Sequence, residues 1–345
     1  MNLRHLFAGA VLLLICITVG CSFADKRQEI PSPVTYHPLP KTVESSSTPL
    51  LGKSITIATG DISGVYFPLG QALASIYGQY DGAFTGTRIT KASIENARLV
   101  SEKKAELGFA TVDAIASEGY VFSTEKQQPI PSRLCALTGL YFNYIHIAVT
   151  KKSGIRSLKD LTGKRIGMGP IGSGTELNAE RILQAAHLAD GTQKHYFSFS
   201  QASQALRDGV IDAAIFSSGL PNPDVSSLAN DDSLTLISVP EDVITELQRQ
   251  YPYYLKKSIP AETYTDLQND IETIAVKNVL ITYRELPTEI AYELTKDFYA
   301  HLPELYDAHP AAREIDAEQA GKNIYLPLHP GAARYFEETR QKQAN

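Results

Sequence analysis

Short apolar runs alternate with longer amphipathic segments along most of the chain. The first such unit begins after Lys53, and its pattern predicts a strand, a turn-rich loop, two helices and a second, buried strand. In that order these elements occupy residues 54–58, 59–64, 65–77, 94–104 and 107–111. Gly78 is expected to cap the first helix.

The same plan returns about a hundred residues later. A strand, a glycine-rich loop, two helices and a strand are predicted at residues 165–168, 169–175, 177–187, 201–207 and 211–216. Strands that alternate with helices favour parallel sheets covered by helices on both faces. The pattern therefore predicts an α/β fold with two similar lobes.

Two further strands indicate how the lobes are joined. Residues 144–150 and 274–283 alternate as extended segments on either side of the second unit, so the chain is expected to cross between the lobes twice. The tail from Thr288 to Phe336 is predicted to be mostly helical and to return to the first lobe. We assign residues 53–148 and 276–345 to lobe 1 and residues 149–275 to lobe 2.

The N-terminal segment has the pattern of an export signal. Arg4 precedes an uncharged run from Leu6 to Gly20, which is shorter than the roughly 20 residues of a membrane span and fits a signal peptide at residues 1–20. Small residues before Cys21 resemble a lipobox, which predicts lipidation of Cys21; cleavage after Ala24 is the alternative. The mature protein is then exported to the periplasm or cell envelope.

A segment rich in Pro and Ser follows the signal. We expect residues 21–52 to form an extended tether with no strand or helix, because Pro recurs too often for either period between residues 25 and 50. A lipid anchor would need such a tether. Cys135 lies in an apolar stretch and is expected to be a buried small hydrophobic residue.

Composition narrows the possible functions. The chain has 345 residues, of which 43% are hydrophobic and 20% charged, so it can bury a large core. Its 32 Lys and Arg against 38 Asp and Glu give a formal net charge of -6, without a long basic run. Nucleic acid is therefore not an expected partner, since phosphate binding needs clustered cations.

The two loops that follow strands and open helices are the predicted binding site. In open α/β sheets, ligands bind outside the carboxyl ends of the strands, where helix N-termini offer unpaired N–H groups to an anion. The candidate ligand-binding residues are Thr59, Gly60, Ser63, Gly64, Val65, Tyr66, Ser93, Asn96, Tyr141, Ser173, Gly174 and Thr175.

Structural roles compete for several of these residues. Ser173 and Glu176 fit a capping box, Ser63 could cap the first helix, and Ser93 and Asn96 could cap the second. The Tyr candidates could be packing residues. The tyrosine cluster at residues 251–254 is expected to pack on the lobe surface. No Arg lies in either loop, so helix termini or a Lys or Arg from elsewhere must balance the charge of an anion.

Catalytic motifs are incomplete in the glycine-rich loop. Gly169 and Gly174 have the spacing of a P-loop, but Thr175 stands where that motif requires Lys, and Leu177 stands where GxGxxG requires its third Gly. Ser173 lacks the outer glycines of GxSxG, and the eight His form no HExxH. We therefore expect no enzyme, no cofactor and no metal site, although spacing alone does not exclude a carboxylate pair.

An ordered series of short motifs resembles the TAXI-type solute-binding proteins of TRAP transporters. Together the motifs cover nearly all of residues 53–336. They occur at residues 59–60, 64–70, 93–96, 108–113, 155–165, 172–175, 209–214 and 328–332.

This resemblance implies a two-lobed periplasmic-binding-protein fold, type II-like, with two crossing strands at the hinge. It also implies a receptor that delivers a small organic anion, glutamate or a related dicarboxylate, to the membrane subunits of a TRAP transporter. Residues 139–143 depart from the acidic ending associated with this segment of the family. We expect the protein to be a monomer. The alternative functions are a sensor-type binding protein for a signalling partner and an exported enzyme.

Overall fold

The computed structural model describes residues 34–36, 48–120, 133–230, 234–265 and 267–344. The predicted signal peptide and Cys21 lie outside the described residues. The described chain forms a mixed sheet with the strand order β1-β3-β2-β4-β11-β5-β8-β6-β7, with β10 paired to β11 and β9 to β5.

The first strand set holds the first predicted unit. It consists of β2 (Ser54–Ala58), β3 (Phe84–Arg88) and β4 (Leu107–Thr111). β2 lies in the middle and pairs in parallel with both neighbours. The connecting helices are α1 (Tyr66–Asp81), α2 (Ser93–Ser101) and, after β4, α3 (Val112–Ser117).

The second strand set repeats this arrangement. It consists of β6 (Arg165–Gly167), β7 (Gln193–His195) and β8 (Ala213–Ser218), with β6 in the middle and parallel to both neighbours. Its helices are α4 (Gly174–Ala185), α5 (Phe199–Arg207) and α6 (Pro223–Asn230). The sequence repeat therefore corresponds to a repeat of topology.

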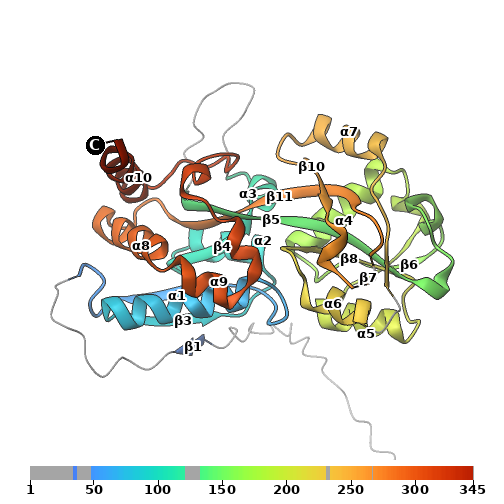
Figure 1. Ribbon diagram of the computed structural model, residues 1–345, viewed down its shortest axis with the longest axis horizontal. Coiled ribbons are helices and arrows are strands. Elements are labelled where there is room, and N and C mark those ends of the chain that lie inside the picture. Colours follow the sequence, from blue (N-terminus) through green and yellow to red (C-terminus); the bar gives the residue numbers. More distant parts are fainter. Residues whose placement is uncertain (1–33, 37–47, 121–132, 231–233, 266, 345) are drawn as a thin grey trace, which may run out of the picture. The chain divides into compact units, whose positions relative to one another are not determined.

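Two long strands join the sets (Figure 1). β5 (Leu134–Thr150) and β11 (Ile271–Tyr283) pair antiparallel with each other, β11 borders β4, and β5 borders β8. Both strands end where the sequence predicted but begin earlier, β5 at Leu134 rather than residue 144 and β11 at Ile271 rather than residue 274. The predicted α/β fold class with two crossing strands is confirmed, and the division into two lobes stays a prediction.

The remaining elements are the C-terminal helices, the elements between α6 and β11, and several short 3-10 turns. The C-terminal helices are α8 (Thr288–Ala300), α9 (Leu302–Ala308) and α10 (Pro330–Ala344). β9 (Leu234–Leu236), α7 (Glu241–Gln250) and β10 (Leu255–Ile259) lie between α6 and β11 in the chain. Short 3-10 turns occur at Lys151–Ser153, Leu158–Leu161, Ala189–Gly191, Ala261–Thr263, Pro310–Glu314 and Ala317–Gln319.

Some sequence expectations about elements were wrong. Gly78 does not cap the first helix: α1 continues to Asp81 and is capped by Gly82, whose φ of 67° is left-handed. Gly78 instead packs closely on β3, because a Cβ there would lie 3.1 Å from Thr85 Oγ1. The sequence pattern also failed to predict β3 and β7, because these strands contain too many polar residues to show an alternation of apolar and polar positions.

Two segments of the predicted tether contact the folded chain. β1 (Val34–Tyr36) pairs antiparallel with the free edge of β3, and the Leu50 side chain is fully buried in the core around Ile55 and Leu73. The expectation that no strand forms between residues 25 and 50 is therefore wrong. An open sheet edge offers backbone hydrogen bonds that compensate for the poor strand propensity of such a sequence.

Three apolar clusters form the core. One of them contains residues from both strand sets and from both crossing strands, such as Ile115, Ile145, Ile182 and Val279. A second packs α8, α9 and α10 against the first strand set, as predicted for the tail, with Leu294, Phe298 and Phe336 among its members. Cys135 is buried, as expected.

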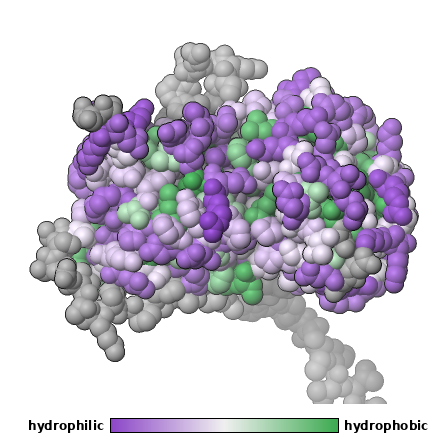
Figure 2. Space-filling model, viewed as in Figure 1, coloured by the Kyte–Doolittle hydropathy of each residue, from purple (hydrophilic) through white to green (hydrophobic). Residues whose placement is uncertain are grey.

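On the face drawn in Figure 2, hydrophilic residues predominate and apolar residues form small separate groups. Within the described ranges, every helix is too short or too polar to cross a membrane.

Candidate functional site

A cavity of about 410 Å³ lies at the carboxyl ends of strands from both sets. It is bordered by the loop after β2, by Thr111 at the end of β4, by the loop after β6, and by Ser217 and Ser218 at the end of β8. This is the position at which open α/β sheets bind ligands.

Nine of the twelve predicted site residues line this cavity. They come from separate parts of the chain, and the fold brings them together: Gly60, Gly64, Val65, Tyr66, Ser93, Tyr141, Ser173, Gly174 and Thr175. Whether they contact a ligand remains a prediction.

The other three predicted residues do not line the cavity. The hydroxyl of Thr59 donates to the carbonyl of Arg88, and the side-chain amide of Asn96 donates to the carbonyls of Thr59 and Phe109. Both side chains are fully buried and tie β2, β3 and β4 to α2. Ser63 donates to Asp61 Oδ1 through its N–H and its hydroxyl, 3.0 Å each. Thr59, Ser63 and Asn96 thus have structural partners.

Sequence reasoning missed the rest of the lining. These residues are Asp61, Ile62, Ile89, Thr90, Lys91, Ala92, Thr111, Asn143, Pro170, Ser198, Phe199, Ser217 and Ser218. Ser198 could have been predicted from the sequence, because Ser198 and Gln201 have the spacing of a capping box and form one at the start of α5. The carboxyl end of β8 could also have been included by the same rule that selected the two loops.

Four helices begin at the cavity. For each of α1, α2, α4 and α5, both the N-cap residue and the first helical residue line it; the N-caps are Val65, Ala92, Ser173 and Ser198. A helix N-terminus carries about half an elementary positive charge, from N–H groups without helical partners. The cavity is therefore surrounded by positive helix ends.

These four helix starts differ in how they are capped. Ser173 Oγ accepts the N–H of Glu176 at 3.1 Å, and Ser198 Oγ accepts the N–H of Gln201 at 3.3 Å. The Ser173 cap is as predicted, but Glu176 reaches back to the N–H of Gly172 rather than to that of Ser173.

The helix starts of the first strand set lack such caps. Val65 and Ala92 make no side-chain cap, so the suggestions that Ser63 caps α1 and that Ser93 or Asn96 caps α2 are wrong. The Ala92 backbone has φ 70° and ψ −142°, a conformation that a residue with a Cβ rarely adopts.

A chain of hydrogen bonds forms the polar floor of the cavity. The Tyr66 hydroxyl donates to Asn278 Oδ1 and lies 3.1 Å from Ser93 Oγ. The amide of Asn278 donates to Asn143 Oδ1 at 2.8 Å, and the amide of Asn143 donates to the Ser217 carbonyl at 3.1 Å. The chain thus runs from α1 through both crossing strands to β8. Burial raises the pKa of Tyr66 well above its ordinary value, so the hydroxyl stays neutral.

Tyr141 has a fully buried hydroxyl with no hydrogen-bond partner among the described residues. Its ring packs where a Cβ on Gly219 would lie only 2.7 Å from it, so Gly219 makes room for the ring. A buried hydroxyl without a partner is costly. The Tyr141 hydroxyl is therefore available to a bound molecule.

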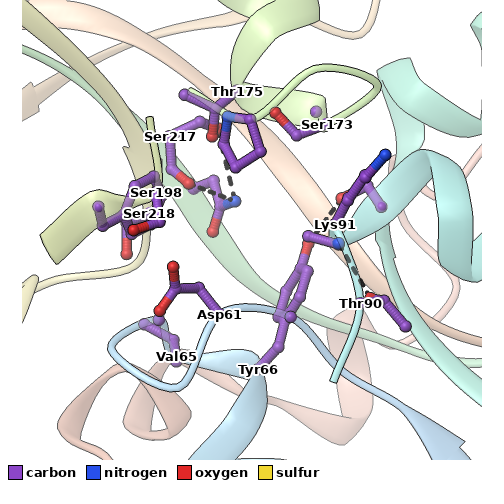
Figure 3. A pocket seen from close by; sticks show the side chains of 18 of the residues that line it. Asp61, Val65, Tyr66, Thr90, Lys91, Ser173, Thr175, Ser198, Ser217 and Ser218 are labelled. Carbon is purple, nitrogen blue, oxygen red and sulfur yellow. Dashed lines mark hydrogen bonds between the residues drawn. The ribbon is translucent and has the colours of Figure 1, made fainter. Parts of the chain in front are cut away.

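Among the residues that the structure describes, one cation and one carboxylate border the cavity. Figure 3 shows Lys91 near Thr90 and Ser173, and Asp61 on the other side of the space, near Ser218. Lys91 has no ion-pair partner in the described part of the chain, whereas Asp61 already accepts two hydrogen bonds from Ser63. Lys91 lies outside the two predicted loops and places one positively charged side chain in the lining of the cavity.

The start of α4 lies directly against the first strand set. A Cβ at Gly174 would lie 3.2 Å from Ser93 Oγ and 3.4 Å from Thr111 Oγ1. Glycine at this position therefore allows the starts of α2 and α4 to meet at the cavity.

A buried ion pair holds α4 two turns further along. Arg181 Nη1 lies 3.5 Å from Asp113 Oδ2. Arg181 also donates to the Tyr254 hydroxyl at 3.0 Å, and that hydroxyl donates to Asp113 Oδ2 at 3.2 Å. The Arg181 guanidinium also lies 4.1 Å from the ring centre of Tyr251. Burial raises the pKa of the Asp113 carboxyl, although the Arg181 charge opposes that shift. Tyr254 is fully buried, so the predicted surface role of this tyrosine cluster is wrong for Tyr254.

Comparison with known families identifies the chain. Residues 57–339 match the model of the NMT1-like family, which is well over half of the chain. The protein therefore belongs to the NMT1-like family.

Solved structures provide more distant likenesses. The alkanesulfonate-binding protein SsuA from Xanthomonas axonopodis pv. citri, bound to MOPS, is similar with a TM-score of 0.45, 18% identity and 85% of each chain covered. The GluR0 ligand-binding core from Nostoc punctiforme, in complex with L-glutamate, is similar with a TM-score of 0.43 and 16% identity, over 73% of this chain and 97% of that chain.

Proposed function

We propose that this protein is an exported receptor that binds a small organic anion in the cavity and passes it to a membrane transporter. One observation carries the proposal: the N-cap and first residue of four helices all line a single cavity. Helix N-termini are favourable places for carboxylates and similar anions.

The charges around the cavity support an anionic ligand. Four helix ends contribute roughly two elementary positive charges, at about half a charge each. Lys91 adds one cation, and Asp61 is the only carboxylate among the described residues of the lining. The balance is positive, in a space that is partly removed from water, where electrostatic attraction is stronger than in bulk solvent.

The ligand class follows from this balance together with the sequence resemblance. A cavity of about 410 Å³ suits a molecule of a few carbon atoms. Two uncapped helix starts and Lys91 can hold one or two carboxylates. The resemblance to TAXI-type proteins favours glutamate or a related dicarboxylate, and a TRAP-type transporter as the partner.

Export and anchoring rest on the N-terminal sequence. We propose that residues 1–20 are removed and that Cys21 is lipidated. The variant Cys21→Ala should then leave the membrane fraction and appear in the soluble fraction. A mature wild-type protein that is already fully soluble and begins at Asp25 would contradict the anchor.

The assignment of residues 53–148 and 276–345 to one lobe, and 149–275 to the other, supports a hinge at β5 and β11. A ligand that bridges both strand sets favours the closed arrangement through its differential affinity. Small-angle scattering should show a smaller radius of gyration with saturating ligand, and an unchanged radius would contradict hinge closure.

The decisive experiment measures anion binding directly. We expect glutamate or a C4–C5 dicarboxylate to raise the melting temperature in a concentration-dependent way, since a ligand that binds the native state stabilises it. Titration calorimetry then compares Lys91→Met with Lys159→Met, a matched change of a lysine outside the cavity. Lys91→Met should weaken binding by roughly tenfold to a hundredfold, because it removes a charge-assisted contact.

The control and the contrary result are equally defined. Lys159→Met should keep wild-type affinity. If no organic anion stabilises the protein, or if both lysine variants bind like the wild type, the cavity does not serve as the proposed anion site. Conversion of a bound ligand to product would instead favour an exported enzyme.

A further inference from the structure

Three carboxylates gather far from the cavity, between α1 and α8. Asp81 is the last residue of α1, and Glu293 and Asp297 are one turn apart on α8, so they share a face of that helix. One carboxylate oxygen of each lies within 4.8 Å of those of the other two. The cavity is at the other end of α1, roughly 24 Å away for a helix of 16 residues.

The cluster is buried and incompletely partnered. Asp81 is 2% exposed and Asp297 is 7% exposed, yet the Oδ2 atom of each has no hydrogen-bond partner among the described residues. Buried carboxylate oxygens without a partner are strongly unfavourable. Without a cation, the Asp81 and Asp297 carboxyls can hydrogen-bond to each other only if one of them is protonated, whereas a cation between them lets both ionise.

The charge of the cluster defines what is missing. When all three carboxyls are ionised they carry three negative charges, and Lys296, which pairs with Glu293, compensates one, so two remain in excess. The C-terminal end of α1 adds a further partial negative charge at Asp81.

The two helices hold this geometry firmly. The Tyr77 hydroxyl, fully buried, donates to the Leu294 carbonyl at 3.0 Å and so fixes α1 against α8 beside the three carboxylates. A site built on packed helices keeps its donor atoms in place without a ligand.

We propose that Asp81, Glu293 and Asp297 form a binding site for one calcium ion. A doubly charged cation neutralises the two excess negative charges. Oxygen-only donors favour a hard cation, and three carboxylates can supply up to about six oxygens at the distances that Ca²⁺ accepts. Mg²⁺ fits less well because it normally retains several waters, for which a buried cluster has little room.

The test uses the full chain after treatment with EDTA and measures thermal unfolding while CaCl₂ is added at constant ionic strength. A saturable rise of the melting temperature is expected, and a smaller rise with MgCl₂. Titration calorimetry should give a single site. Asp297→Asn should weaken Ca²⁺ binding by roughly tenfold or more, while Asp307→Asn, an exposed aspartate of α9, should leave it unchanged.

The contrary outcomes are clear. No response of the wild type to Ca²⁺ at millimolar concentration would overturn the site, as would an Asp297→Asn variant that responds like the wild type. An equal response to Mg²⁺ would overturn the assignment to calcium. If Asp297→Asn does not fold, Glu293→Gln replaces it, with the same expected loss. Glutamate binding in the cavity is measured separately, so failure here does not affect the proposed function.

Discussion

The helix starts on the two sides of the cavity are built differently. In the second strand set, α4 and α5 are capped by Ser173 and Ser198, and α4 is held again by the buried pair of Arg181 with Asp113. In the first strand set, α1 and α2 begin at Val65 and Ala92 without any side-chain cap. On the second side a Ser side chain accepts one first-turn N–H of each helix, whereas on the first side no side chain caps the start of α1 or α2.

We infer from this difference that the two strand sets have different roles in binding an anion. A helix end with a side-chain cap has satisfied part of its hydrogen-bonding capacity and gains less from an anion. An uncapped end beside Lys91 gains more. We therefore expect the first strand set to provide most of the affinity for an anion, and the second to provide the rigid wall against which the anion is held.

The largest expected effect is a loss of stability when the buried ion pair of Arg181 with Asp113 is broken. Arg181→Ala leaves the Asp113 carboxylate buried without its cation, which should reduce the free energy of unfolding by about 3–5 kcal/mol. Urea denaturation measures this loss. Arg249→Ala, which removes an arginine paired with Glu246 on the protein surface, is the control and should have a much smaller effect. Equal losses in the two variants would show that the buried pair is not an anchor.

A carboxylate introduced at the uncapped start of α2 should weaken anion binding. Ala92→Asp places a carboxylate at the N-cap, where it can occupy the first-turn N–H groups and repel a ligand anion. We expect a loss of about 3 kcal/mol in binding free energy, roughly a hundredfold in affinity.

The neutral variant Ala92→Asn is the matched control for this change. Its side chain has the same size and tolerates a positive φ equally well, so it isolates the charge. Calorimetry should show clearly tighter anion binding by the Asn variant than by the Asp variant. Equal affinities would mean that the ligand anion does not lie at the start of α2.

The smallest effect concerns a capped helix start. Ser198→Ala removes the cap of α5 and should lower the free energy of unfolding by about 1 kcal/mol. Anion affinity should remain within about twofold of the wild type, because the Ser198 hydroxyl is already engaged with Gln201. A large loss of affinity at unchanged stability would instead place Ser198 in contact with the ligand.

The sequence by itself determined the repeated strand and helix plan, because apolar periodicity is a local property of the chain. It predicted β2, β4, β6, the crossing strands and both loops, and the carboxyl-end rule then identified most of one wall of the cavity. It also anticipated the Ser173 cap, since capping depends on residues three positions apart.

Only the tertiary structure decided which of these local features face the same space. Lys91, Asn143, Ser198 and Ser218 are far apart in sequence, and no local pattern connects them. Thr59 and Asn96 do not line the cavity for the same reason: their hydrogen-bond partners, Arg88 and Phe109, lie on other strands. Asp81 and Asp297 are separated by more than two hundred residues, and only the packing of α1 on α8 brings their charges together. Distant residues meet because burial of apolar surface fixes how helices and sheets pack, and that packing is a property of the whole chain.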